Sequence, residues 1–272
     1  MKKYEFTGET KRVELWNRTA TLHRIKATVE FGFVKVGELG GWIEKEENLS
    51  HEGKAWVCGD AKVCGNAKVC GNAKVCGDAE VCGDAEVWGN AKVWGNAKVC
   101  GDAEVCGDAE VWGNAKVWGN AKVCGNAKVC GDAEVCGDAE VWGNAKVWGN
   151  AKVCGDAKVC GNAKVCGNAK VCGDAEVCGD AEVWGNAKVC GDAEVFLASH
   201  VLVMGSVGSR NDFTTFFRDK DNEITVKCGC FLGKIDKFLE KVTQTHGNNK
   251  YALVYRAAVE VAKLQIELTE RK

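Results

Sequence analysis

The chain has 272 residues, 46% of them apolar, and a formal net charge of −2 at pH 7. Such a composition is ordinary for a soluble protein, and the weak charge argues against the basic surface that nucleic-acid binding requires. The N-terminus has no apolar signal-peptide core, and no run approaches the roughly 18 apolar residues of a membrane-spanning helix. We therefore expect a cytoplasmic protein without a nucleic-acid or membrane partner.

Residues 1–56 precede a regular repeat and predict an N-terminal cap with the first irregular coils. Short alternating apolar runs are separated by glycine-rich corners, as expected for strands that lead into a repetitive fold. Ile43 and Leu49 are six residues apart, and a two-residue insertion then precedes Val57. The tryptophans of this segment are interpreted as core and lid residues: Trp16, Trp42 and Trp56.

From Val57 to Val195 one six-residue phrase, V-[CW]-G-[DN]-A-[KE], repeats without insertion. A strict short period identifies a solenoid, in which each repeat packs on its neighbours. Glycine in every sixth place excludes a helix, and glycine followed by Asp or Asn is typical of a turn. The A-[KE]-V triplet alternates small, charged and β-branched side chains, which predicts a short strand with Ala and Val on one face.

Each hexad therefore predicts one strand and one corner, and three hexads predict a triangular coil of 18 residues. Ala and Val should fill the narrow interior, while Lys or Glu and the Cys or Trp after each Val should point outward. Apolar, strand-like residues continue past Phe196, so we assign residues 57–204 to the solenoid.

The hexads resemble the hexapeptide-repeat left-handed parallel β-helix, in which an aliphatic residue comes first and a small residue fifth, as do Val57 and Ala61. The resemblance implies a left-handed coil, whereas composition alone would also allow a right-handed one. The phrases GGWIE, NLS and AWV before the repeat, and TTFFRDKD, KCGCFLG and THGNNKYA after it, are similar to uncharacterised bacterial and prophage-associated proteins with such repeats. That group implies no reaction and no cofactor.

The outward positions of the coil carry cysteines, tryptophans and charges. In an 18-residue coil, columns such as Cys64, Cys82 and Cys100 stack at about 4.8 Å, but parallel Cβ vectors hold the sulfurs apart. We expect free thiols, with oxidation and soft-metal binding as alternatives. Trp94 should stack on Trp112, but the other tryptophans scatter over all faces, which disfavours a stacking platform. The charges are interpreted as serving solubility.

Residues 205–272 have a different composition and predict a small ββαα module. Residues 213–218 and 224–227 alternate in strand fashion around a turn, which indicates a hairpin. Apolar residues at helical spacing predict one helix that ends at residue 246, before a glycine, and a second helix from about 249 to 268.

The C-terminal module carries two weak candidate sites. One is an anion contact on the hairpin, formed by Arg210, Arg218 and Lys227. The other is an oligomer contact on one stripe of the second helix, formed by Val254, Ala258, Val261 and Leu268. Cys228 and Cys230 lack the second ligand pair of a zinc site and are interpreted as packing residues. His246 is interpreted as a cation at a helix C-terminus.

No catalytic, cofactor-binding or metal-binding residue is assigned. The acyltransferases of the resembled fold use a histidine in a groove between coils, and its carbonic anhydrase branch needs three for zinc. Here all four histidines lie outside residues 57–195: His23, His51, His200 and His246.

The leading hypothesis is a non-catalytic β-solenoid scaffold or interaction protein with a protein partner or self-association, a homodimer being favoured. The first alternative is a small-ligand or anion-binding protein that acts through the C-terminal module. The second is an acyltransferase-like enzyme.

Overall fold

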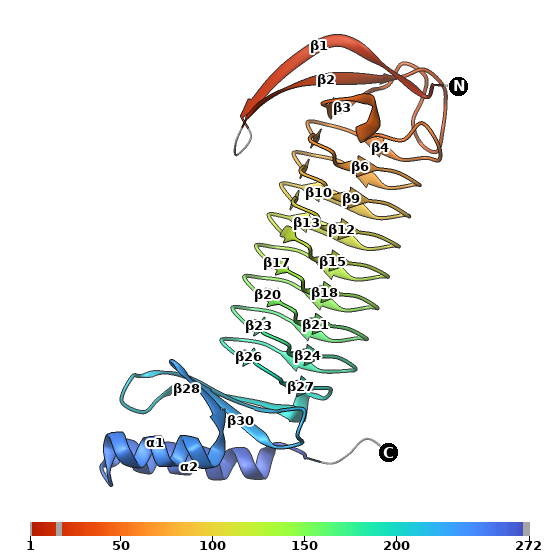
Figure 1. The fold of residues 1–272 in the computed structure, drawn as a ribbon. Coiled ribbons are helices and arrows are strands. Elements are labelled where there is room, and N and C mark those ends of the chain that lie inside the picture. The colour runs from red at the N-terminus through yellow and green to blue at the C-terminus, as the bar shows by residue number, and fades with distance from the viewer. Residues whose placement is uncertain (1, 15–17, 269–272) are drawn as a thin grey trace. The chain divides into compact units, whose positions relative to one another are not determined.

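A computed structural model describes residues 2–14 and 18–268, so Trp16 lies outside the described residues (Figure 1). The chain divides into two compact units, residues 1–143 and 144–272. In both units short strands stack in parallel at an interval of 18 residues, which confirms the predicted β-solenoid. None of the helices in the described part of the chain is long and apolar enough to cross a membrane.

In residues 1–143 the coils form three parallel sheets. The first contains β5 (Lys62–Val63), β8 (Glu80–Val81), β11 (Lys98–Val99), β14 (Lys116–Gly119) and β17 (Glu134–Gly137). The second contains β4 (Trp56–Val57), β7 (Lys74–Val75), β10 (Lys92–Gly95), β13 (Glu110–Gly113) and β16 (Lys128–Val129). The third contains β6 (Lys68–Val69), β9 (Glu86–Val87), β12 (Glu104–Val105), β15 (Lys122–Val123) and β18 (Glu140–Val141).

The coils of residues 144–272 are built in the same way. Three strands share one side: β20 (Lys152–Gly155), β23 (Lys170–Cys172) and β26 (Lys188–Cys190). Three share the next: β19 (Lys146–Val147), β22 (Lys164–Val165) and β25 (Glu182–Val183). The remaining three are β21 (Lys158–Val159), β24 (Glu176–Val177) and β27 (Glu194–Val195).

The interior of the coils is filled by valine and alanine. Val57, Val75 and Val93 lie in register, and each is fully buried. The side chains of Lys62 and Glu80 point outward, with 23% and 33% of their surface exposed. The inward and outward positions of the hexad are therefore confirmed, and each coil buries its apolar residues against its neighbours.

The corner glycines are required for two reasons. Every one from Gly59 to Gly191 has φ between 65° and 76°, a region that other residues rarely adopt. The next coil also stacks directly on the corner, because a Cβ on Gly65 would lie 2.7 Å from the carbonyl oxygen of Gly83. The second reason is a tertiary one, and turn chemistry alone does not predict it.

The N-terminal segment begins with a long hairpin that was not predicted from the sequence. Strands β1 (Tyr4–Glu14) and β2 (Thr19–Ala27) pair antiparallel, and β2 pairs antiparallel with β3 (Leu39–Ile43). Strand β3 then pairs in parallel with β5, Ile43 opposite Val63, and after helix η1 (Glu46–Asn48) Leu49 bridges to Val69. These pairs are 20 residues apart instead of 18, which accommodates the two-residue insertion before Val57.

The C-terminal module is an antiparallel sheet followed by two helices, as predicted, and its sheet has four strands, two more than the predicted hairpin. Their order is β28 (Val201–Val207), β29 (Asp212–Arg218), β30 (Ile224–Cys228) and β31 (Phe231–Lys234). Helix η2 (Ala198–His200) precedes the sheet, and α1 (Ile235–His246) and α2 (Lys250–Gln265) follow it. Strand β28 pairs with β29, so the solenoid boundary placed at residue 204 falls inside a strand of the module. The predicted hairpin and both helices are confirmed, although α2 ends three residues earlier than expected.

Candidate functional site

The C-terminal sheet packs across the last coil of its own unit. Thr215 Oγ1 accepts a hydrogen bond from the backbone N–H of Lys188 at 2.9 Å, and Ala193 forms a β-bridge with Asp219. The backbone N–H of Lys220 donates to the carbonyl of Asp192 at 3.0 Å. Polar backbone groups at the end of a solenoid invite further strand pairing unless something covers them, and here the sheet covers part of that end.

The three cations of the predicted anion contact do not converge. Arg218 is only 8% exposed, and its guanidinium bonds to the Glu194 carboxylate at 3.1 Å and to Asn222 Oδ1 at 2.9 Å. It therefore fastens the sheet to the last coil. Lys227 lies on β30 opposite Thr215 and Leu232, whereas Arg210 lies in the turn before β29, beside Gly229. Arg210 lines a pocket of the module whose lining includes neither Arg218 nor Lys227.

Asp219 is the polar centre of the turn between β29 and β30. Its carboxylate accepts hydrogen bonds from Thr225 Oγ1 at 2.5 Å and Lys234 Nζ at 2.6 Å, and from the backbone N–H groups of Asp221 and Glu223. Burial of the carboxyl opposes ionisation, but these hydrogen bonds outweigh it and lower the pKa of Asp219 below its ordinary value. The turn is therefore organised around a buried negative charge.

Helix α2 packs one of its two apolar faces into the module. Asn249 caps its N-terminus by accepting hydrogen bonds from the backbone N–H groups of Tyr251 and Ala252. The packed face joins residues of β29, β30 and α1 in one core, and it consists of Ala252, Tyr255, Ala258, Val259, Ala262 and Ile266. Ala258 is only 2% exposed, so its predicted place in an oligomer stripe is wrong.

The opposite face of α2 is an exposed apolar stripe. It consists of Leu253, Val254, Ala257, Val261 and Leu264, and the exposed Leu268 lies just beyond the end of the helix. Leu264 is 90% exposed, and Leu253 is 59% exposed. Val254, Val261 and Leu268 were predicted to lie on this surface, whereas Leu253 and Leu264 were not. Both faces are apolar, so spacing alone did not separate them.

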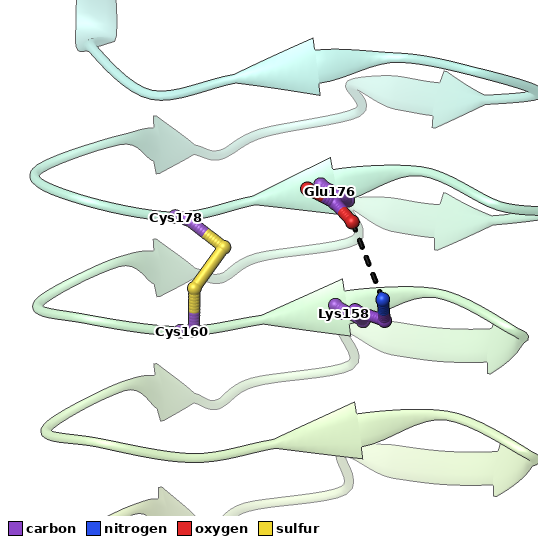
Figure 2. Close-up of a disulfide and its surroundings, with 4 residues drawn as sticks. All are labelled: Lys158, Cys160, Glu176 and Cys178. Carbon is purple, nitrogen blue, oxygen red and sulfur yellow. Dashed lines mark hydrogen bonds and ion pairs between the residues drawn. A yellow bond between two sulfur atoms is a disulfide. The ribbon is translucent and has the colours of Figure 1, made fainter.

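The cysteine columns correct the expectation of free thiols at three places. Cys58 and Cys76, Cys160 and Cys178, and Cys172 and Cys190 form disulfides between successive coils, with Cα atoms 4.4 to 4.7 Å apart. Figure 2 shows Cys160 and Cys178 beside the ion pair of Lys158 and Glu176. The side chains rotate toward each other, so parallel Cβ vectors do not prevent a bond. Other cysteines, among them Cys70, Cys124 and Cys154, are not part of a disulfide.

The other outward columns form ladders along the coils. The rings of Trp94 and Trp112 stack as predicted, 5.1 Å apart and 2° from parallel. Glu80 bridges Lys62 and Lys98 at 2.9 Å each. Asparagine ladders, which were not predicted, also run along the coils: one side-chain amide donates a hydrogen bond to the Asn or Asp side chain of the next coil, as Asn72 does to Asn90. These contacts repeat with the coil and mark no single site.

Two of the histidines bond to nearby backbone groups. Lys3 donates its backbone N–H to His51 Nδ1, and Phe196 donates its own to His200 Nδ1, so both imidazoles have local structural partners. No cluster of three or more His, Cys, Asp or Glu side chains suited to a metal occurs within residues 2–14 and 18–268. Cys228, Cys230 and His246 instead line the pocket that contains Arg210.

No protein-family model matches this sequence, and no curated protein is significantly similar to it. The resemblance to hexapeptide-repeat proteins therefore depends on the hexads and flanking phrases alone, while the β-solenoid itself is seen in the strand pairing.

Proposed function

We propose that this protein is a non-catalytic β-solenoid scaffold whose C-terminal module pairs with a second copy of the chain. The single observation that carries the proposal is the exposed apolar stripe of α2, on a helix whose other face is already packed. An exposed row of large aliphatic side chains on a soluble domain marks an interaction surface.

A second copy is the occupant that the stripe fits. Val254, Ala257, Val261 and Leu264 follow one another on α2 at intervals of three and four residues, the spacing by which identical helices interlock. Beside the stripe, Lys263 pairs with Glu260 of its own helix at 2.9 Å. Because these opposite charges neutralise each other within each copy, two copies can approach without repulsion between like charges at this position. A two-fold arrangement would cover both stripes at once.

The size of the stripe predicts a weak dimer. On pairing, about half of the surface of each large aliphatic side chain is removed from water. Each such side chain then contributes roughly 1 kcal/mol to the free energy of association, or about 10 kcal/mol in total for two stripes. Association costs roughly 4 to 15 kcal/mol, so a micromolar or weaker dissociation constant follows. Because the sheet covers part of the last coil, a closed dimer through α2 is favoured over an open chain of copies joined at that end.

The test is light scattering on the full-length protein over a range of concentrations. We expect a concentration-dependent dimer that Leu264→Lys converts to a monomer, since Leu264 is 90% exposed and makes little contribution to the fold. Gln244→Lys places the same charge on the exposed polar side of α1 and should leave the dimer intact. A monomer at every concentration, or a dimer that survives Leu264→Lys, would contradict the proposal.

A further inference from the structure

A pocket of about 340 Å³ lies inside the C-terminal module, away from the outward stripe of α2. Its floor is apolar, with the rings of Phe231 and Phe238 5.3 Å apart and Tyr255 edge-on to Phe238 at 5.5 Å. Volumes of this size accommodate a small organic molecule, and a hydrophobic floor with a few polar groups is typical of ligand sites.

The polar lining of the pocket is cationic. Arg210 and Lys241 line it, and no Asp or Glu is among the described residues that do so. Other cations of the module are neutralised: Arg218 pairs with Glu194, and Lys234 pairs with three carboxylates. Within residues 2–14 and 18–268, neither Arg210 nor Lys241 makes an ion pair. Their charges are therefore available to a ligand.

Neutral hydrogen-bonding groups lie beside these cations. Ser209 Oγ is 3.3 Å from His246 Nε2, and the Tyr255 hydroxyl lies 4.0 Å from Cys228 Sγ. Burial raises the pKa of Tyr255 above its ordinary value, and Cys228 raises it further, so the phenol stays protonated at neutral pH. Its hydroxyl is therefore a donor and adds no negative charge to the pocket.

We propose that this pocket binds a small aromatic anion, such as an aryl carboxylate or aryl phosphate. The anionic group would bind Arg210 and Lys241, while the ring packs against Phe231 and Phe238. A guanidinium pairs with carboxylate or phosphate through two parallel hydrogen bonds, which suits an oxyanion at the rim of an apolar floor. The inference is independent of self-association, since the pocket uses other residues.

Calorimetric titration with phenyl phosphate and with benzoate tests the site. We expect the intact protein to bind at least one of them, and Arg210→Gln and Lys241→Gln each to weaken binding about tenfold, the effect of losing one charge-assisted hydrogen bond. Inorganic phosphate and phenol, which carry only one half of the recognition chemistry, should each bind at least about tenfold more weakly.

Lys227→Gln is the matched control. It removes the same charge next to Cys228 on β30, but Lys227 does not line the pocket, so affinity should not change. Equal weakening by Lys227→Gln would indicate nonspecific attraction to surface charge and overturn the site. Binding of neither probe at millimolar concentration would also overturn it. Leu264→Lys should bind normally, which separates this result from the test of the dimer.

Discussion

Cys172 and Cys190 occupy the same position on successive coils and are joined by a disulfide, with their Cα atoms 4.6 Å apart. Their backbones pair in register, and so do those of Cys154 and Cys172. Cys154 therefore stands one strand spacing from the disulfide, on the side away from Cys190. Thiol–disulfide exchange proceeds by attack of a neighbouring cysteine sulfur on the disulfide, and Cys154 lies in the position from which it can pair with Cys172.

We expect Cys190→Ser to retain as many disulfides as the native chain, because Cys172 can pair with Cys154 instead when oxidised glutathione is supplied. Cys178→Ser should lose one, because the residues 18 places before Cys160 and after Cys178 are Trp142 and Phe196. Counting labelled thiols by intact mass in denaturant distinguishes the two variants. Equal loss in both would show that the column does not exchange partners.

Two corner glycines allow the effect of the backbone conformation on stability to be separated from the effect of coil stacking. Gly167 and Gly185 have φ of 71° and 67°, but a Cβ on Gly167 would lie 3.1 Å from the backbone nitrogen of Gly185, whereas a Cβ on Gly185 meets nothing within 4 Å. Gly185→Ala should lose about 1 to 2 kcal/mol of stability from the left-handed backbone alone. Gly167→Ala should lose about 1 kcal/mol more because the next coil must shift.

Urea unfolding monitored by tryptophan fluorescence gives a midpoint for each variant, and the two midpoints measure this difference in stability. The two variants share the residue change and the position in the hexad, so composition and the unfolded chain are matched. Identical midpoints would mean that the coils adjust freely and that only the backbone conformation demands glycine.

The buried carboxylate of Asp219 predicts how the module responds to acid. Its pKa is lower in the folded protein than in the unfolded chain, so its contribution is complete above the unfolded value near 4 and is lost as pH falls through the lower folded value. Asp219→Asn should lower stability at pH 7 by about 1 to 3 kcal/mol and flatten the acid dependence below pH 4.

Thermal unfolding of the module between pH 2 and pH 7 checks this prediction. Asp221→Asn is the control, because Asp221 also pairs with Lys234 but its side chain is 60% exposed. The same loss of stability in both variants would assign the effect to surface charge instead of the buried hydrogen bonds of Asp219.

The sequence alone determined the coil. A valine every sixth residue, an alanine between and a glycine corner repeat identically, so each hexad meets the same neighbours and a local pattern suffices to predict Val57 opposite Val75. The two-residue insertion after Leu49 was equally visible, and its effect is the 20-residue interval to Val69. The hairpin of 213–227 and the end of α1 at His246 also follow from local turn and cap chemistry.

Only the tertiary structure decided how the segments before and after the repeat fold, because their local sequence patterns are compatible with more than one structure. The sequence of β28 predicts another strand of the solenoid, yet β28 pairs antiparallel with β29 of the C-terminal sheet. Ala258 and Val254 are both apolar, and only packing against the sheet buries the first and exposes the second. Arg218 finds its carboxylate 24 residues earlier in Glu194, and Arg210 shares a pocket with Lys241 from another element. Contacts between distant segments have no period in the sequence, so the fold of the repeat was predictable and the candidate site was not.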